Sequence, residues 1–268
     1  MSALERIAHE SCALARRAGA AILEIYAGSF AVETKSDDSP LTAADMASHR
    51  VIVNGLRALT PDIPVLSEES KGVDWTVRQT WERYWLVDPL DGTREFVKRN
   101  GEFTVNIALI ESHMPVLGVV LVPVTGELYY GIAGEGAFLG TAPGAMPQPI
   151  AIRSAASVPI VAGSRSHGNE RQVAMLENLG YHRLVSVGSS IKFCMVARGD
   201  ADLYLRLGPT SEWDTAAAQC VLEQAGGAVV DLQGKPLRYN TKDSLLNPEF
   251  LALGDPSVDW LAKLGLRG

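Results

Sequence analysis

The sequence has few cysteines, no long apolar run and no excess of positive charge. Three cysteines in 268 residues, none of them in a CxxC pair, predict buried, reduced thiols. No apolar stretch reaches the ~18 residues of a transmembrane helix, and charges near the N-terminus interrupt any signal-peptide core. A net charge of −7 argues against a nucleic-acid partner, because such binding depends on Lys and Arg. We expect a cytoplasmic protein, with peripheral inner-membrane contact and a monomeric or homodimeric state left open.

Apolar periodicity predicts a fold of stacked helix and sheet layers. The length suits two lobes that share one interface, and the Pro-, Gly- and Ala-rich segment 141–149 predicts the boundary, giving lobes 1–145 and 146–268. The second half alternates strand and helix, which is typical of layered α/β packing. The first half is expected to contain helices over 3–26 and 42–59 with Thr42 as N-cap, a strand and loop over 31–41, strands at 65–66, 84–87, 103–110, 116–122 and 127–132, and a hairpin turn at 134–140.

Acidic residues follow two of the predicted strands. Glu68 and Glu69 come directly after one strand, and Asp88 and Asp91 lie at the end of another, within Asp-Pro-Leu-Asp-Gly-Thr. Asp214 comes far downstream, at the start of a predicted helix. Carboxylates that converge repel one another unless cations lie between them, and a set of oxygen ligands suits Mg²⁺ or Mn²⁺. This pattern predicts a metal-dependent enzyme that acts on phosphate esters.

Each acid can be given a role in a site with two metal ions. Two Mg²⁺ about 3.5–4 Å apart can hold a phosphoryl group and activate water. Asp88 is predicted to bridge them, with Glu68 on one ion and Asp91 on the other. The carbonyl of Leu90 would add an oxygen ligand, and Asp214 would complete the second ion's ligands.

The residues that follow would handle water and phosphate. Gly92 and Thr93 would begin a helical turn whose N–H groups face a phosphate. Thr93 would orient the attacking water, with Glu69 as its acceptor, and Asp45 would serve a third cation or the water network. Taken singly, each motif also fits a structural role: the Asp-Pro-Leu-Asp-Gly segment is a common turn composition, and Glu68 and Glu69 fit a solvated strand end.

Three strings taken together resemble a known family. LSEES (66–70), WLVDPLDGTREF (85–96) and EWDTAAA (212–218) are similar to the signature of the inositol monophosphatases, Mg²⁺-dependent phosphatases inhibited by Li⁺. The resemblance implies a layered α-β-α-β-α sandwich of the α+β class, with two lobes and the active site between them. It also implies two or three Mg²⁺ ions, replaceable by Mn²⁺ and antagonised by Li⁺ and Ca²⁺. It assigns Glu68, Asp88, Leu90, Asp91 and Asp214 to the metals and Thr93 to the water.

A closer resemblance is to the bacterial 3'(2'),5'-bisphosphate nucleotidase branch. It extends through DSPLTAAD (38–45), residues 83–110, SRSH (164–167), residues 188–218 and residues 234–250. It implies hydrolysis of 3'-phosphoadenosine 5'-phosphate, or its 5'-phosphosulfate analogue, in sulfate assimilation. His167, Ser189, Lys192 and Arg206 would bind the nucleotide, together with Glu68, Leu90, Asp91, Gly92, Thr93 and Asp214.

Two alternatives stay open at this point. The same chemistry could act on inositol monophosphate or fructose 1,6-bisphosphate, and His167, Lys192 and Arg206 discriminate between the hypotheses, because a nucleotide offers them a remote 5'-phosphate that a plain inositol phosphate lacks. A non-catalytic module could hold a divalent ion, although Thr93 and Glu69 would then have no water to orient. Glu212, beside the Trp213–Asp214 pair, adds an acid to which the sequence gives no role.

Overall fold

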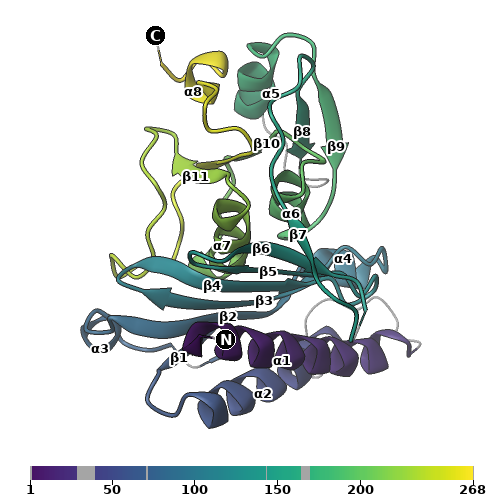
Figure 1. Ribbon diagram of the computed structural model, residues 1–268, viewed down its shortest axis with the longest axis vertical. Coiled ribbons are helices and arrows are strands. Elements are labelled where there is room, and N and C mark those ends of the chain that lie inside the picture. The colour runs from purple at the N-terminus through teal and green to yellow at the C-terminus, as the bar shows by residue number, and fades with distance from the viewer. Residues whose placement is uncertain (1, 29–39, 71, 143, 164–169, 268) are drawn as a thin grey trace.

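The chain folds into five alternating layers of helix and sheet (Figure 1). The computed structural model describes residues 2–28, 40–70, 72–142, 144–163 and 170–267. Its elements are α1 (Ala3–Tyr26), α2 (Pro40–Leu59), β1 (Val65–Ser67), α3 (Trp75–Arg78), β2 (Arg83–Asp91), α4 (Thr93–Val97), β3 (Thr104–Glu111), β4 (Met114–Leu121), β5 (Leu128–Ile132), β6 (Gly136–Gly140), β7 (Gln148–Ile150), β8 (Ile160–Gly163), α5 (Glu170–Glu177), β9 (Arg183–Ser186), α6 (Ile191–Ala197), β10 (Leu203–Arg206), η1 (Glu212–Asp214), α7 (Ala216–Gln224), β11 (Ala228–Asp231), β12 (Phe250–Leu253) and α8 (Trp260–Lys263).

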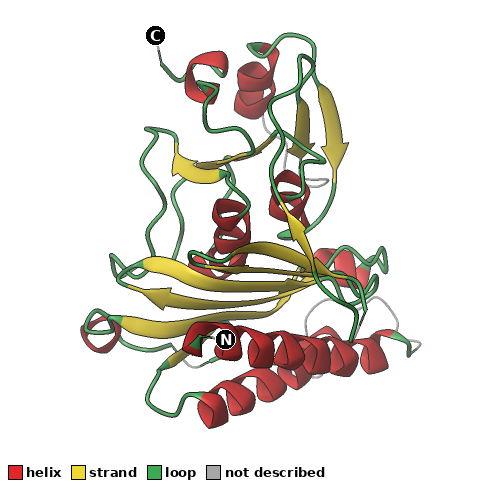
Figure 2. Ribbon diagram, viewed as in Figure 1, coloured by secondary structure: helices red, strands yellow, loops and turns green. Residues whose placement is uncertain are grey.

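Three hydrophobic cores fill the spaces between the five layers. The first lies between α1–α2 and the first sheet, the second packs both sheets against α6–α7, and the third lies beneath α5 and α8 on the second sheet. Figure 2 shows the two long helices on one outer face and the short helices at the opposite end. The predicted α-β-α-β-α architecture is therefore confirmed.

The first helix begins and ends as expected. Ser2 accepts a hydrogen bond from the backbone of Glu5, whose carboxylate bonds back to Ser2 N–H, forming a capping box. The prediction for α2 was wrong at its start, because the helix begins at Pro40 and Thr42 lies inside it. Proline is well suited to a first helical turn, where its missing N–H has no partner to lose. Most of the strand and loop expected over 31–41 falls outside the described residues.

The first sheet carries the strand that bears two of the acids. Its order is β1 to β7 in sequence, with β1 parallel to β2 and the remaining pairs antiparallel. The turn predicted within 134–140 joins β5 to β6, although residues 136–140 are themselves a strand. β7 also pairs with this sheet, while the lobe boundary at 145/146 stays a prediction.

The second sheet has the order β11-β12-β10-β8-β9. β8 is parallel to β9 and β10, whereas β12 runs antiparallel to its two neighbours. The alternation of strand and helix predicted for the second half is present between residues 160 and 231, as β8, α5, β9, α6, β10, α7 and β11. Phe250–Leu253 and Trp260–Lys263 were not predicted as a strand and a helix.

Two glycines set how closely α7 approaches the first sheet. A Cβ added to Gly118 on β4 would overlap the backbone carbonyl of Ala217, and one added to Gly131 on β5 would lie 2.8 Å from the carbonyl oxygen of Cys220. Neither position has room for a methyl group. α7 therefore lies directly on the strands, and η1, the turn before it, contacts β2.

Two further sequence predictions can be compared with the fold. Cys194 and Cys220 are buried free thiols, as expected, whereas Cys12 is only partly buried. Among the described helices, none is both long enough and apolar enough to cross a lipid bilayer.

Candidate metal centre and phosphate pocket

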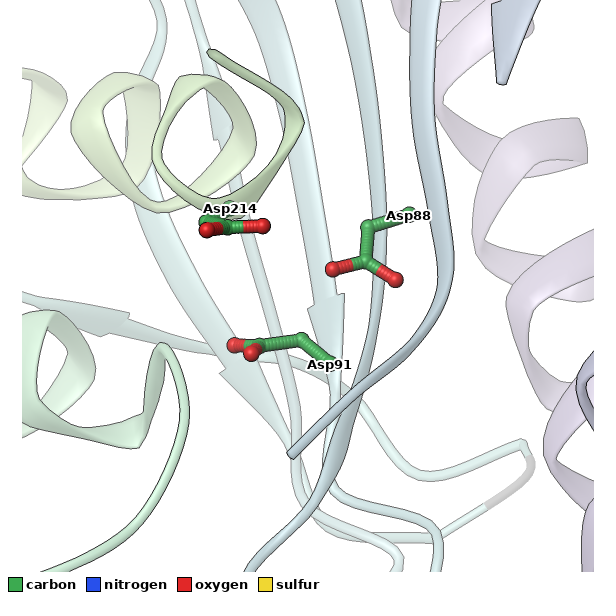
Figure 3. A group of neighbouring side chains, drawn as sticks. All are labelled: Asp88, Asp91 and Asp214. Carbon is green, nitrogen blue, oxygen red and sulfur yellow. The ribbon is translucent and has the colours of Figure 1, made fainter. Parts of the chain in front are cut away.

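Three carboxylates from distant parts of the chain converge on one point. Asp88 and Asp91 come from β2, and Asp214 comes from η1. Each offers one oxygen, and these oxygens lie within 4.8 Å of one another. Figure 3 shows the side chains of Asp88 and Asp91 directed from the strand toward Asp214, which lies at the turn before α7. The structure thus brings together three acids that the sequence analysis placed at one centre.

An irregularity in β2 lets two acids of one strand face the same side. Asp88 pairs with Asn106 and Asp91 with Thr104, so the register shifts between them. Pro89 lies in this bulge, where a central strand can accept a residue without an N–H. Asp88 Oδ1 accepts a 3.0 Å hydrogen bond from the N–H of Leu90. Ser48 Oγ donates to the Pro89 carbonyl at 2.7 Å, which ties the bulge to α2.

The side chain of Asp214 is oriented by a hydrogen bond within its own turn. Its Oδ2 accepts a 2.9 Å hydrogen bond from Ser211 N–H, as part of a capping box around η1. This bond leaves oxygen lone pairs of the carboxylate available toward Asp91. The last predicted acid is therefore fixed by local backbone structure as well as by the packing of α7.

The electrostatics of the centre favour either protons or cations. Burial, followed by the charges of Glu68, Asp91, Asp214 and Asp45, raises the pKa of Asp88 well above its usual value. Burial and then Asp91 raise the pKa of Asp214 to about 7. Burial also raises the pKa of Asp91, against the opposing charge of Lys192. Hard cations, which prefer oxygen ligands, would stabilise these closely spaced negative charges. With no nitrogen or sulfur donor in the cluster, the donor set fits Mg²⁺ or Mn²⁺ and not a zinc site.

Two of the other predicted acids, Glu68 and Asp45, lie close enough to the cluster to act on Asp88. Glu68 directly follows β1, and its N–H donates to the Val87 carbonyl at 3.1 Å. It is, after burial, the largest influence on the pKa of Asp88. Asp45 is buried on α2 and also acts on Asp88. Glu69 is half-buried, and its charge acts on His49 of α2, whose Nδ1 lies 2.9 Å from Ser67 Oγ.

A pocket of about 280 Å³ opens beside the acids. Gly92 adopts a left-handed conformation (φ 98°), which glycine tolerates, and Thr93 begins α4 directly after it. A Cβ at Gly92 would lie 3.1 Å from the Glu102 carbonyl oxygen. The predicted residues that line the pocket are Asp91, Gly92, Thr93, Ser189, Lys192, Arg206 and Asp214.

Two cations, Lys192 and Arg206, line the same pocket and act on the pKa of Asp91. Lys192 is buried on α6, and its Nζ donates to the carbonyls of Ser189 (2.6 Å) and Val187 (3.2 Å). Burial lowers the pKa of Lys192 to about 8. Arg206 at the end of β10 is oriented by bonds to the carbonyls of Gly208 and Pro209. Ser189 has a positive φ of 45°, and its buried Oγ has no hydrogen-bond partner in the described chain.

Other charged residues close in sequence to these motifs differ in what they contact. His167 lies outside the described residues. Arg94 lines the pocket, whereas Arg99 donates to the carbonyls of Tyr26 and Gly28 and therefore binds the end of α1. Both carboxylate oxygens of Glu212 accept the N–H of Asn240, at 3.0 and 2.8 Å. Glu212 thus anchors a loop and is not part of the acidic cluster.

The sequence analysis missed three polar residues beside the acids. Ser190 N–H donates to Asp91 Oδ2 at 2.7 Å. Ser190 Oγ donates to Asn106 Oδ1 at 2.8 Å and lies 2.8 Å from Thr104 Oγ1. The alternation of β3 could have placed Thr104 and Asn106 on the same face as Asp88. Nothing in the sequence indicated that Ser190 would reach them from the other lobe.

Comparisons with known proteins identify relatives over most of the chain. The model of the inositol monophosphatase family matches residues 3–255. The 3'(2'),5'-bisphosphate nucleotidase CysQ of Salmonella typhimurium is 56% identical over 241 residues, covering 89% of this chain and 96% of that protein. CysQ of Escherichia coli K12 is 54% identical with the same coverage. The crystal structure of CysQ from Bacteroides thetaiotaomicron superposes with a TM-score of 0.86 at 41% identity, covering 93% of this chain and 98% of that one.

Proposed function

The chain belongs to the inositol monophosphatase family, and on that premise we propose that it is a Mg²⁺-dependent 3'(2'),5'-bisphosphate nucleotidase. The reaction is hydrolysis of the 3'-phosphate of 3'-phosphoadenosine 5'-phosphate, giving AMP and phosphate. The CysQ relatives, at 54–56% identity, carry this name. The 5'-phosphosulfate analogue has the same 3'-ester and a similar anionic tail, so we include it as a substrate. We place the reaction in the cytoplasm.

The observation that carries the proposal is a pocket lined by both acids and cations. Asp91 and Asp214 line it together with Lys192 and Arg206, whose positive charges act on Asp91. A substrate with two phosphates suits this arrangement, because one phosphate would lie over the metal centre and the other against the cations. A phosphate accepts charge-assisted hydrogen bonds from both Lys and Arg. The unpartnered Ser189 Oγ adds a donor beside Lys192, and we assign His167 to the phosphate that binds these cations.

Glu68, Asp88, the Leu90 carbonyl, Asp91 and Asp214 would hold two Mg²⁺ ions, and Asp45 would serve a third or the water network. When bound, the cations supply Lewis acidity and lower the pKa of water. Thr93 would hydrogen-bond the attacking water, with Glu69 accepting from Thr93. The N–H groups after Gly92 would face the phosphate oxygens. By holding the cations, the carboxylates would fix where the scissile phosphate binds, so that water attacks in line with the leaving 3'-oxygen.

A phosphate-release panel tests this function. The substrates are 3'-phosphoadenosine 5'-phosphate, its phosphosulfate, inositol 1-phosphate and fructose 1,6-bisphosphate, each with Mg²⁺, with Mg²⁺ plus Li⁺ or Ca²⁺, and without metal. We expect the two adenosine compounds to be turned over fastest, only with Mg²⁺ or Mn²⁺, and both Li⁺ and Ca²⁺ to inhibit. Faster release from inositol phosphate would replace the proposal with an inositol monophosphatase. No release from any substrate would leave only a metal-binding role.

A further inference from the structure

Asn106 lies on β3 directly opposite Asp88, and one end of its side chain has no hydrogen-bond partner in the described chain. The two residues are register partners in the antiparallel β2–β3 pair. Directly opposed Cβ atoms on one face of such a pair are about 5 Å apart. The shared face is the one turned toward the second lobe, because Asn106 contacts Ser190 and Asp88 lies beside Asp214. The side chain of Asn106 therefore borders the metal centre.

The amide of Asn106 is held by its carbonyl end. Oδ1 accepts a 2.8 Å hydrogen bond from Ser190 Oγ, which itself lies 2.8 Å from Thr104 Oγ1. Ser190 is fixed in turn by the 2.7 Å bond from its N–H to Asp91 Oδ2. These contacts set the orientation of the Asn106 side chain and leave Nδ2 directed elsewhere.

Nδ2 of Asn106 is a buried donor without an acceptor. The residue is 1% exposed, and no acceptor in the described chain lies within hydrogen-bond range of Nδ2. Buried amide donors in folded proteins nearly always have partners, since an unmet donor loses its bonds to water and gains nothing. A donor of this kind next to a substrate site indicates that its acceptor arrives with the ligands.

We propose that Asn106 Nδ2 donates a hydrogen bond to an acceptor oxygen that enters the site with the substrate or its cations. Asn106 is then a ligand-contacting residue of the phosphatase centre, and Ser190 is its positioning residue. This inference rests on the proposed function. The oxygen belongs either to the phosphate group or to a water that enters with the cation, and the two sources can be separated by experiment.

The test compares Asn106→Leu, Ser190→Ala and the double variant. Asn106→Leu removes both amide ends and keeps the same number and branching of side-chain heavy atoms, whereas Ser190→Ala removes the positioning bond and keeps Nδ2. Three quantities are measured: Mn²⁺ affinity by electron paramagnetic resonance, affinity for inorganic phosphate with Mn²⁺ present, and kcat/KM for 3'-phosphoadenosine 5'-phosphate. We expect Asn106→Leu to lower kcat/KM by about tenfold, the value of one hydrogen bond, and Ser190→Ala to lower it less.

The binding measurements identify the oxygen. A fall in Mn²⁺ affinity without phosphate assigns the bond to a water that enters with the cation. Unchanged Mn²⁺ affinity with about tenfold weaker binding of phosphate assigns it to the phosphate group. If Asn106→Leu matches Ser190→Ala in all three quantities, or leaves both affinities at the wild-type values, Asn106 has only a structural role and the proposal is overturned.

Controls keep the outcome interpretable. Circular dichroism and thermal unfolding check that each variant is folded, and Asn106→Ala replaces the leucine variant if that one does not fold. Asn178→Ala removes another Asn amide bond, to the carbonyl of Leu264, and is expected to behave as wild type. An inactive wild-type protein would contradict the proposed function. An active wild-type protein whose Asn106→Leu variant keeps the wild-type affinities and kcat/KM would contradict this inference alone.

Discussion

Lys192 Nζ donates a 2.6 Å hydrogen bond to the carbonyl of Ser189, and it also lies 5.2 Å from the centre of the Tyr204 ring. The ammonium is thus held at the wall of the pocket by a carbonyl and an aromatic face. Such a group is already oriented before a phosphate reaches it, so little side-chain entropy is lost on binding.

Lys192→Ala is predicted to be selective between substrates. It removes a charged donor worth about 1.5–3 kcal/mol, which corresponds to a roughly 10- to 100-fold loss of kcat/KM for the bisphosphorylated nucleotide. A nucleoside monophosphate that lacks the second phosphate should be affected far less. Steady-state kinetics on both substrates measure the difference, with Lys98→Ala as a control, since Lys98 is exposed and does not line the pocket. Equal losses on both substrates would remove Lys192 from the second phosphate site.

The pKa of Lys192 predicts how binding depends on pH. Burial lowers this pKa to about 8, so the ammonium is present below that pH and is lost above it. KM for 3'-phosphoadenosine 5'-phosphate should therefore rise as pH increases through about 8. Lys192→Arg keeps a positive charge at these pH values, and its KM should be flat over the same range. A rise of equal size in both proteins would assign the pH effect to another group.

Asp88→Asn is predicted to abolish turnover and preserve the fold. The substitution keeps the side-chain volume but removes the charge expected to bridge the cations, which contribute several kcal/mol to catalysis at about 1.4 kcal/mol per tenfold in rate. We expect kcat to fall by roughly 10³-fold or more. Phosphate release and circular dichroism measure the two properties, with Asp62→Asn in an exposed turn as the matched control. Near-normal turnover in Asp88→Asn would exclude this residue as the bridging ligand.

Removing metal is predicted to make stability fall as pH rises. In the metal-free protein burial and neighbouring acids raise the pKa of Asp214 from 3.8 to about 7. Between these values the folded protein holds a proton that the unfolded chain releases, so this group's contribution to stability is lost as pH rises through the window. Mg²⁺ binds the deprotonated form, so its stabilising effect should grow over the same range. Thermal unfolding at pH 5 and 7.5, with EDTA or Mg²⁺, tests this. A Mg²⁺ effect that is equal at both pH values would contradict it.

Glu212→Ala is predicted to affect stability and not metal binding. The carboxylate of Glu212 accepts the buried N–H of Asn240, and leaving that donor unmet costs about 1–3 kcal/mol. Glu212→Gln keeps one acceptor and should cost less. Urea unfolding gives the free energies, and Mn²⁺ titration of the folded variants serves as the check. A large loss of Mn²⁺ affinity in Glu212→Gln would return this acid to the metal centre.

The parts of this molecule that are predictable from sequence are those encoded locally. The helical spacing of apolar residues in α1 and the strand end before Glu68 can be read from short segments, and the structure agrees with them. The strand expected over 84–87 was too short, because β2 continues through a bulge to Asp91. The strand Phe250–Leu253 could not be recognised, because four apolar residues fit a strand or a buried helix equally well. Its pairing with β10 and β11 depends on contacts with distant residues.

The site shows the same division. Asp88, Asp91 and Asp214 could be proposed as a group because carboxylates that converge repel one another unless cations or protons lie between them. Ser190 could not, since its bond to Asp91 joins residues 99 positions apart in sequence. Glu212 was ambiguous for the same reason: its partner, Asn240, lies 28 residues away in an irregular loop. The roles assigned to the individual ligands and nucleotide contacts stay predictions.

Because Gly118 and Gly131 have no side chains, α7 can lie close to the first sheet. This approach sets the distance between Asp214 and the acids of β2. Because α7 lies flush against β4 and β5, one added methyl group would lift the helix and carry Asp214 away from its partners on β2. In a related protein, substitution of either glycine would therefore change the spacing of the metal ligands, even though every ligand residue is retained. Inspecting the ligands alone would fail to reveal why activity had changed.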